Sequence, residues 1–194
     1  MANKTNDDKG LFWNSQGGDR KYNADSFEKW ISKFISTGVF AEDCAVEAAT
    51  GMNIVMNSGY VNINGKIRLF EEETEFTLEM ADNLSPRIDT VVIERNDNDR
   101  EIVAKVVTGT PAASPEPEAP VRTDTIYQLV VAEVYIGAGV SSITQDKITR
   151  KVDDDNVCGV IKGTLSNNEI SYGNTDLEAG VSELADGQIY FMYE

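Results

Sequence analysis

The side chains that usually perform acid–base and nucleophilic chemistry are scarce in this sequence. It contains no histidine, which excludes Ser-His-Asp and Cys-His arrangements and every imidazole metal ligand. The 33 Asp and Glu residues could still supply the two carboxylates of a glycosidase, which lie about 5 to 10 Å apart. The candidate groups fall at predicted turns or strand ends, where charge is usually solvated: Glu71–Glu73, Asp97 with Asp99, and Asp153–Asp155. We therefore predict no catalytic residue and no enzyme activity.

Sites for metals and phosphate are also poorly supported. The acidic runs at Asp97–Asp99 and Asp153–Asp155 offer oxygen ligands for Ca²⁺, but they lack the glycine and distal glutamate of an EF-hand loop. The segment Asn14–Gly18 contains glycines, yet no Lys-Ser/Thr pair follows it, so it does not match a phosphate-binding loop. We predict no metal site and no cofactor.

Cys44 and Cys158 are too far apart in sequence to match a Cys/His metal spacing. Free buried thiols in a reducing compartment are the default interpretation, and one long-range disulfide is the alternative.

The charge of the chain is unevenly distributed. Residues 1–40 hold six Lys/Arg and five Asp/Glu, whereas residues 41–194 hold eleven and 28, which gives a net charge of −16 overall. An acidic body repels phosphate backbones, so we expect no nucleic-acid partner. The opening residues are polar, and no run of eighteen apolar residues occurs, so we expect no signal peptide and no membrane insertion.

One amphipathic helix is predicted over Asn23–Thr37, after an irregular arm at Met1–Arg20. Asp25 and Glu28 match a capping box, and Gly38 suits a left-handed stop. Its apolar stripe consists of Phe27, Trp30, Ile31, Phe34 and Ile35. The arm carries a second apolar cluster at Leu11, Phe12 and Trp13, which must be buried somewhere.

From Ala45 onward the sequence alternates with period two between turn residues, which predicts antiparallel strands. Asn64-Gly65 predicts a tight hairpin turn. In the strand predicted over 126–136, strict alternation would separate Val130, Ala132 and Val134 from Leu129 and Val131. The expected strands are Met52–Asn57, Tyr60–Asn64, Lys66–Phe70, Thr74–Met80, Ile88–Arg95, Glu101–Thr108, Ile126–Ile136, Val157–Leu165 and Gln188–Tyr193.

Several connections are also predicted. Gly109–Pro120 contains four of the five prolines, which favours a stiff connection without regular pairing. Ser141–Arg150 is predicted to be a helical turn or a loop, and Ser166–Gly187 a loop-rich stretch. Aromatic residues near the end of the sequence, Tyr172, Tyr190 and Tyr193, could contact a saccharide, although the alternation in IYFMY more simply indicates a core strand or a subunit contact.

The predicted fold is mainly β with one N-terminal α-helix: an antiparallel sandwich or barrel-like β domain plus a small C-terminal β module. We divide the chain into residues 1–40 (arm and capped helix, for attachment or oligomerisation), 41–150 (antiparallel β domain) and 151–194 (C-terminal module).

Four phrases occur in an order that resembles a family of phage and prophage tail and baseplate proteins of Gram-positive bacteria. They are GLFWNSQGGDRKYNADSFEKWISKFISTGVF, YVNINGKIRLF, PRIDTVVIERNDNDREIVAKVVTGTPAASP and IYQLVVAEVYIGAGVSSITQDKITR. They are similar to a baseplate upper protein or to the N-terminal region of a receptor-binding protein. The stretch ISYGNTDLEAGVSELADGQIYFMYE resembles a short ending found on various phage tail proteins.

The resemblance implies a virion structural protein located in the tail or baseplate and assembled in the cytoplasm of the bacterial host. Family members often carry further distal domains that reach the host surface, and their absence here favours an assembly or adaptor role. The implied partners are other tail proteins and further copies of the chain, with a trimer favoured. Its expected interface comprises Leu11, Phe12, Trp13, Phe27, Trp30, Ile31 and Phe34. The alternative function is a saccharide-binding module that recognises cell-wall polymers of the host.

Overall fold

A computed structural model describes residues 24–163, 170–173 and 189–192 of the chain. The chain divides into two compact units, Met1–Lys162 and Gly163–Glu194. The described residues are mostly β with one α-helix, and their strands form several sheets without a closed barrel. The predicted fold class is therefore confirmed in its sandwich-like form.

The largest sheet has four antiparallel strands in the order β10-β9-β7-β8. β7 and β9 occupy its centre because both are long and rich in Val and Ile, and they pair over their whole length. The strong alternation of these segments allowed the sequence to predict β7, β8 and β9 within a residue or two at each end. Their bounds are Arg87–Asn96 (β7), Glu101–Val107 (β8), Ile126–Ile136 (β9) and Ile148–Arg150 (β10).

A β-bulge interrupts β9 and changes which residues share a face. Val91 pairs with Ala132 and Val92 with Val130, so Val131 is an extra residue in the ladder. The strict alternation predicted from the sequence is therefore wrong at this point. The residues of β9 that join the hydrophobic core are Leu129, Val131, Ala132, Val134 and Ile136.

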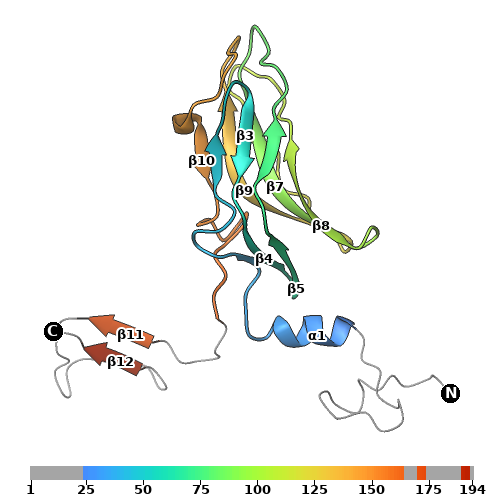
Figure 1. Cartoon of the computed structure of the whole chain (residues 1–194), viewed down its shortest axis with the longest axis vertical. Helices are drawn as coiled ribbons and strands as arrows, with labels where there is room; N and C mark the ends of the chain where they lie inside the picture. The colour runs from blue at the N-terminus through green and yellow to red at the C-terminus, as the bar shows by residue number, and fades with distance from the viewer. Residues whose placement is uncertain (1–23, 164–169, 174–188, 193–194) are drawn as a thin grey trace. The chain divides into compact units, whose positions relative to one another are not determined.

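Two smaller antiparallel sheets complete the first unit, in the orders β2-β3-β6 and β1-β4-β5. Figure 1 shows β3 in front of β7 and β9, and β2 also lies beside β10 and β6 beside β8. Burial of a large aliphatic side chain stabilises the fold by roughly 1.5 to 3 kcal/mol, and the fully buried Ile54 and Met56 of β3 belong to this core. The bounds are Gly38–Val39 (β1), Val46–Ala48 (β2), Asn53–Met56 (β3), Gly59–Ile63 (β4), Lys66–Phe70 (β5) and Thr74–Thr77 (β6).

The hairpin between β4 and β5 confirms the turn predicted at Asn64-Gly65. Both residues have positive φ, 52° and 88°, as a two-residue primed turn requires. Ile63 and Lys66 close the hairpin, and the remaining register follows from them.

The helix α1 covers Ala24–Ile31 and is shorter than the predicted range of Asn23–Thr37. Beyond Ile31 the chain tightens into turns, and the backbone of Ser36 then donates a hydrogen bond to the carbonyl of Lys162 at 2.9 Å. Gly38 does not stop the helix. It lies in β1, where an added Cβ would be 2.2 Å from the carbonyl oxygen of Gly159. Tertiary pairing with residues 159–162 therefore overrides the helical pattern.

The segment after β9 differs from the prediction in two places. Residues 145–147 form a short 3-10 helix, as one alternative allowed, but 148–150 form β10, paired with β9. The strand predicted over Val157–Leu165 is absent from the described residues 157–163, where Val160 makes only an isolated parallel bridge with Val39. The last two residues of that prediction, 164 and 165, lie outside the described part.

In the second unit, β11 (Ile170–Gly173) and β12 (Ile189–Met192) pair in parallel. β12 confirms the strand predicted over Gln188–Tyr193, and β11 falls within a stretch predicted to be loop-rich. In the first unit, the described residues 109–120 contain no strand, which agrees with the proline-rich connection predicted there.

Among the described residues, no helix is long and apolar enough to cross a bilayer. Cys44 and Cys158 are free and buried, as predicted for the two thiols. Burial, assisted by the nearby charge of Asp43, raises the pKa of the Cys44 thiol to about 12. Burial also raises the pKa of Cys158 to about 12.

Candidate interaction groove

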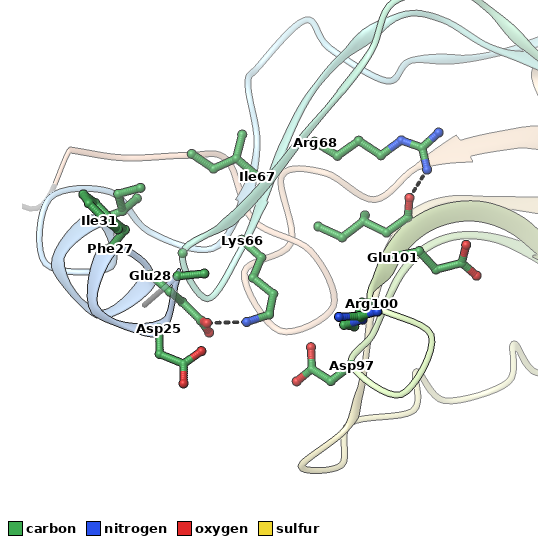
Figure 2. A pocket seen from close by; sticks show the side chains of 13 residues that line it. Asp25, Phe27, Glu28, Ile31, Lys66, Ile67, Arg68, Asp97, Arg100 and Glu101 are labelled. Carbon is green, nitrogen blue, oxygen red and sulfur yellow. Dashed lines mark hydrogen bonds and ion pairs between the residues drawn. The ribbon is translucent and has the colours of Figure 1, made fainter. Parts of the chain in front are cut away.

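A cavity of about 920 Å³ opens between three segments of the first unit. They are α1, the tip of the β4–β5 hairpin with the start of β5, and the turn between β7 and β8 (Figure 2). We call this cavity the groove. Its volume falls within the range of roughly 300 to 1,000 Å³ that is typical of binding clefts.

α1 forms one wall of the groove through Phe27 and Ile31. An eight-residue helix is marginally stable in water on its own, and no residue of α1 is fully buried. α1 contacts the β domain through a polar interaction, in which Glu28 accepts a hydrogen bond from the Lys66 ammonium. The backbone of Gly65 also approaches Glu28 so closely that an added Cβ would be 2.2 Å from its carbonyl oxygen.

These contacts change the interpretation of the predicted capping box. Asp25 lies within the first turn of α1, where its negative charge is favourable beside the helix N-terminus. Glu28 points to the hairpin and pairs with Lys66 (Figure 2). The spacing of the two acids was therefore not evidence for reciprocal capping, because one of them makes a tertiary contact.

β5 forms the second wall and carries apolar groups toward solvent. Ile67 and Leu69 are 50% and 38% exposed. Arg68 extends from the strand to donate a hydrogen bond to the carbonyl of Ile102 at the start of β8 (Figure 2). Its guanidinium also lies over the ring of Phe70, 4.5 Å from the centroid, as in a cation–π contact.

The turn between β7 and β8 forms the third wall. The side-chain carbonyl of Asn96 accepts hydrogen bonds from the backbone N–H groups of Asn98 and Asp99, at 3.0 and 3.3 Å. Asp97 pairs with Arg95 at 3.0 Å, and Arg100 has a positive φ of 56°. Asn96 and the Arg95–Asp97 pair therefore stabilise the local geometry of this turn.

The other acidic runs are similarly engaged or exposed. Glu71–Glu73 lie exposed between β5 and β6. Asp153 pairs with Arg150 at 3.3 Å and Asp155 with Lys162 at 2.8 Å. Within the described ranges, no three His, Cys, Asp or Glu residues are grouped so that they could hold a metal ion.

Glu94, on β7, is a buried acid outside the groove lining. Burial opposes its ionisation, but hydrogen bonds from Lys105 and Gln128, together with the charge of Lys105, hold its pKa below the usual value. The bonds from Lys105 and Gln128 are both 2.6 Å long. This arrangement satisfies the Glu94 carboxylate on the sheet.

The predicted interface residues are only partly brought together. Phe27 and Ile31 line the groove. Trp30 and Phe34 are about half exposed and meet edge to face, with their ring centroids 4.8 Å apart. Leu11, Phe12 and Trp13 lie outside the described residues.

The predicted saccharide contacts belong to the second unit. Tyr172 pairs with Phe191 and Tyr190 with Ser171, so the two tyrosines are one register position apart. Tyr193 lies outside the described residues. Saccharide binding at these positions stays a prediction.

The sequence did not single out the β5 and β7–β8 walls of the groove. The alternation of KIRLF places Ile67 and Leu69 on one face, but it does not say whether that face is covered. The three segments converge only in the folded chain.

Comparisons with protein family models, with curated proteins and with solved structures find no match to this chain.

Proposed function

We propose that the chain is a non-enzymatic assembly or adaptor subunit of a phage or prophage tail or baseplate. The observation that carries the assembly role is the incompletely covered apolar surface around α1 and β5. Trp30, Phe34, Ile67 and Leu69 each expose between 38% and 50% of their surface. Of these side chains, Ile67 lines the groove together with Phe27 and Ile31 of α1. Exposed apolar side chains beside a groove are typical of a surface that another protein covers.

Two further features support this role. Asp99, Asp153 and Asp154, in the described turns, are used in local hydrogen bonds and ion pairs. The ordered phrases that resemble tail and baseplate proteins include α1, the β4–β5 hairpin and the β7–β8 hairpin. These are the three elements that surround the groove.

The test of this function is the composition of purified tail particles. Particles from a bacterium that carries this gene should contain the chain as a stoichiometric component, detected by quantitative mass spectrometry and by antibody labelling in electron micrographs. Removal of residues 1–20 should abolish this incorporation while the β domain stays folded, as judged by circular dichroism. Absence of the full chain from the particles, or unchanged incorporation of the truncated chain, would contradict the proposal.

A glycan array carrying bacterial wall polymers distinguishes the alternative. Specific binding that is lost on substitution of Tyr172 or Tyr190 by Ala, together with absence from particles, would favour the saccharide-binding module instead.

A further inference from the structure

The outer edge of β5 is open in the described part of the chain. In the sheet order β1-β4-β5, β5 pairs with β4 alone. The two-residue turn makes Ile63 and Lys66 a hydrogen-bonded pair, and such pairs alternate with non-bonded pairs along an antiparallel ladder. The backbone N–H and C=O groups of Ile67 and Leu69 therefore point away from β4.

The two charged side chains of this edge, Lys66 and Arg68, are engaged with Glu28 and with the carbonyl of Ile102, while its apolar side chains are exposed. Natural sheets usually cover an edge or place charges and prolines on it. Here Ile67 and Leu69 are exposed on the outer face, and Leu69 lies opposite Tyr60, which is itself 45% exposed. The Tyr60 ring also meets Phe40 edge to face at 6.4 Å. Free backbone groups beside an apolar face are the features that accept an added strand.

The space beside the edge is the groove. The side chain of Arg68 crosses it and bonds to the carbonyl of Ile102 (Figure 2). This bond has to be exchanged when a strand enters, and a guanidinium on a long side chain can reorient without moving the sheet.

The sequence before α1 contains a segment whose composition allows strand pairing. The described part begins at Ala24, which lines the groove. The preceding residues 1–23 contain no proline, so each can contribute to a strand ladder. Within them, strand alternation would place Leu11 and Trp13 on one face, the spacing needed to lie beside Ile67 and Leu69.

The reach of this segment allows exchange between copies. Ten residues separate Trp13 from Ala24, and an extended chain of ten residues spans up to roughly 33 to 36 Å. That distance is about twice the length of a five-residue strand. An apolar surface left exposed within one chain also favours a second chain as its cover.

We propose that the segment around Leu11, Phe12 and Trp13 of one copy adds as a strand to the β5 edge of a second copy. The proposal rests on the assembly function and names its partner as the chain itself. It also assigns a binding role to Ile67 and Leu69 through both their backbone and their side chains.

Disulfide trapping tests the occupant directly. The full chain with Asn14→Cys is combined with Ile67→Cys or Leu69→Cys, because the native thiols are buried and their pKa values are raised to about 12. Mild oxidation should give dimers and larger covalent species on non-reducing gels in at least one combination. Only intramolecular bonds, or no bonds in either combination, would overturn the proposal. So would equal dimer formation by Leu69→Cys alone, because that result would indicate β5 pairing with β5.

Proline substitution tests the backbone edge. Leu69→Pro removes an N–H that points outward, so the subunit should keep its circular dichroism spectrum and its bonds to β4. Self-association measured by light scattering on dilution should weaken at least tenfold relative to the wild type. Ala119→Pro is the control, because Ala119 is exposed in the proline-rich connection between β8 and β9, outside any strand, and the substitution should leave association unchanged. Wild-type association of Leu69→Pro would overturn the proposal.

If Leu69→Pro unfolds, Leu69→Lys tests the same edge through its side chain. Self-association should again weaken at least tenfold, and wild-type association of this variant would overturn the proposal. These outcomes differ from a failure of the proposed function. If the chain enters tail particles but yields no trapped dimers, the proposed function stands and this inference is wrong.

Discussion

The buried ion pair between Arg87 and Asp89 links the start of β7 to the segment after β6 and to the segment after β8. Asp89 is fully buried and accepts hydrogen bonds from the Arg87 guanidinium at 2.8 Å and from the backbone N–H of Gly109 at 2.9 Å. Arg87 also donates to the carbonyls of Glu79 and Met80. Every charge in this cluster therefore has a partner, which is the condition for burying it.

We predict that Asp89→Ala lowers the free energy of unfolding by about 3 to 5 kcal/mol, because it leaves a buried guanidinium and a backbone N–H without their partner. Urea denaturation followed by circular dichroism measures the change. Asp153→Ala is the control, since the exposed Arg150–Asp153 pair at 3.3 Å should contribute less than about 1 kcal/mol. Equal losses in the two variants would contradict this interpretation.

At the scale of elements, the sequence predicts those structures whose determinants are local. The alternation of β7 and β9 and the Asn64-Gly65 turn are properties of consecutive residues, and the structure contains all three. The end of α1 was mispredicted because residues 36–39 pair with residues 159–162, 120 or more positions away. β1, β2 and β10 are only two or three residues long, too short to show a period.

The groove illustrates the same limit. Phe27 and Ile31 were found because they share a helical stripe, but Ile67, Arg68 and Arg100 join them through the packing of distant segments. No local pattern distinguishes an exposed apolar strand face from a buried one.

The close approach of β1 to the segment around Gly159 gives a prediction at this scale. Gly38→Ala should destabilise the fold by more than 1 kcal/mol, as expected where an added Cβ meets backbone atoms at positive φ. The strand would have to shift away from Gly159, whose oxygen lies 2.2 Å from the added Cβ. Equilibrium unfolding in urea measures the loss. Gly139→Ala is the matched control, with φ of 66° and nothing within 4 Å. It should carry only the backbone cost, so an equal effect in both variants would argue against the contact.

At the scale of the whole molecule, charge and apolar surface are divided between different parts of the chain. Residues 41–194 carry the acidic excess, while residues 1–40 are close to neutral. Like-charged bodies repel one another, so copies of this chain associate most favourably through the nearly neutral part. The Leu11–Trp13 cluster of the proposed strand exchange belongs to that part. The β5 edge that receives it lies in the acidic part, but this strand itself carries the two positive charges of Lys66 and Arg68.

The acidic composition also determines how stability responds to pH. The pKa of Glu94 is lowered in the folded chain, as are those of Asp82 and Asp154, whose carboxylates accept backbone hydrogen bonds. A lowered pKa means that the unfolded chain binds more protons than the folded chain at acidic pH. The stabilisation is complete above the usual carboxyl pKa values of about 4 and is lost as the pH falls through the folded values.

We therefore predict that the free energy of unfolding changes little between pH 8 and pH 6 and falls steeply below about pH 4. Glu94→Gln should be less stable than the wild type at neutral pH, because the attraction to Lys105 is lost, and its decline in acid should be shallower. Urea midpoints measured from pH 3 to pH 8 give both curves. Parallel curves for the two proteins would show that Glu94 takes no part, and stability that rises on acidification would contradict the lowered pKa values themselves.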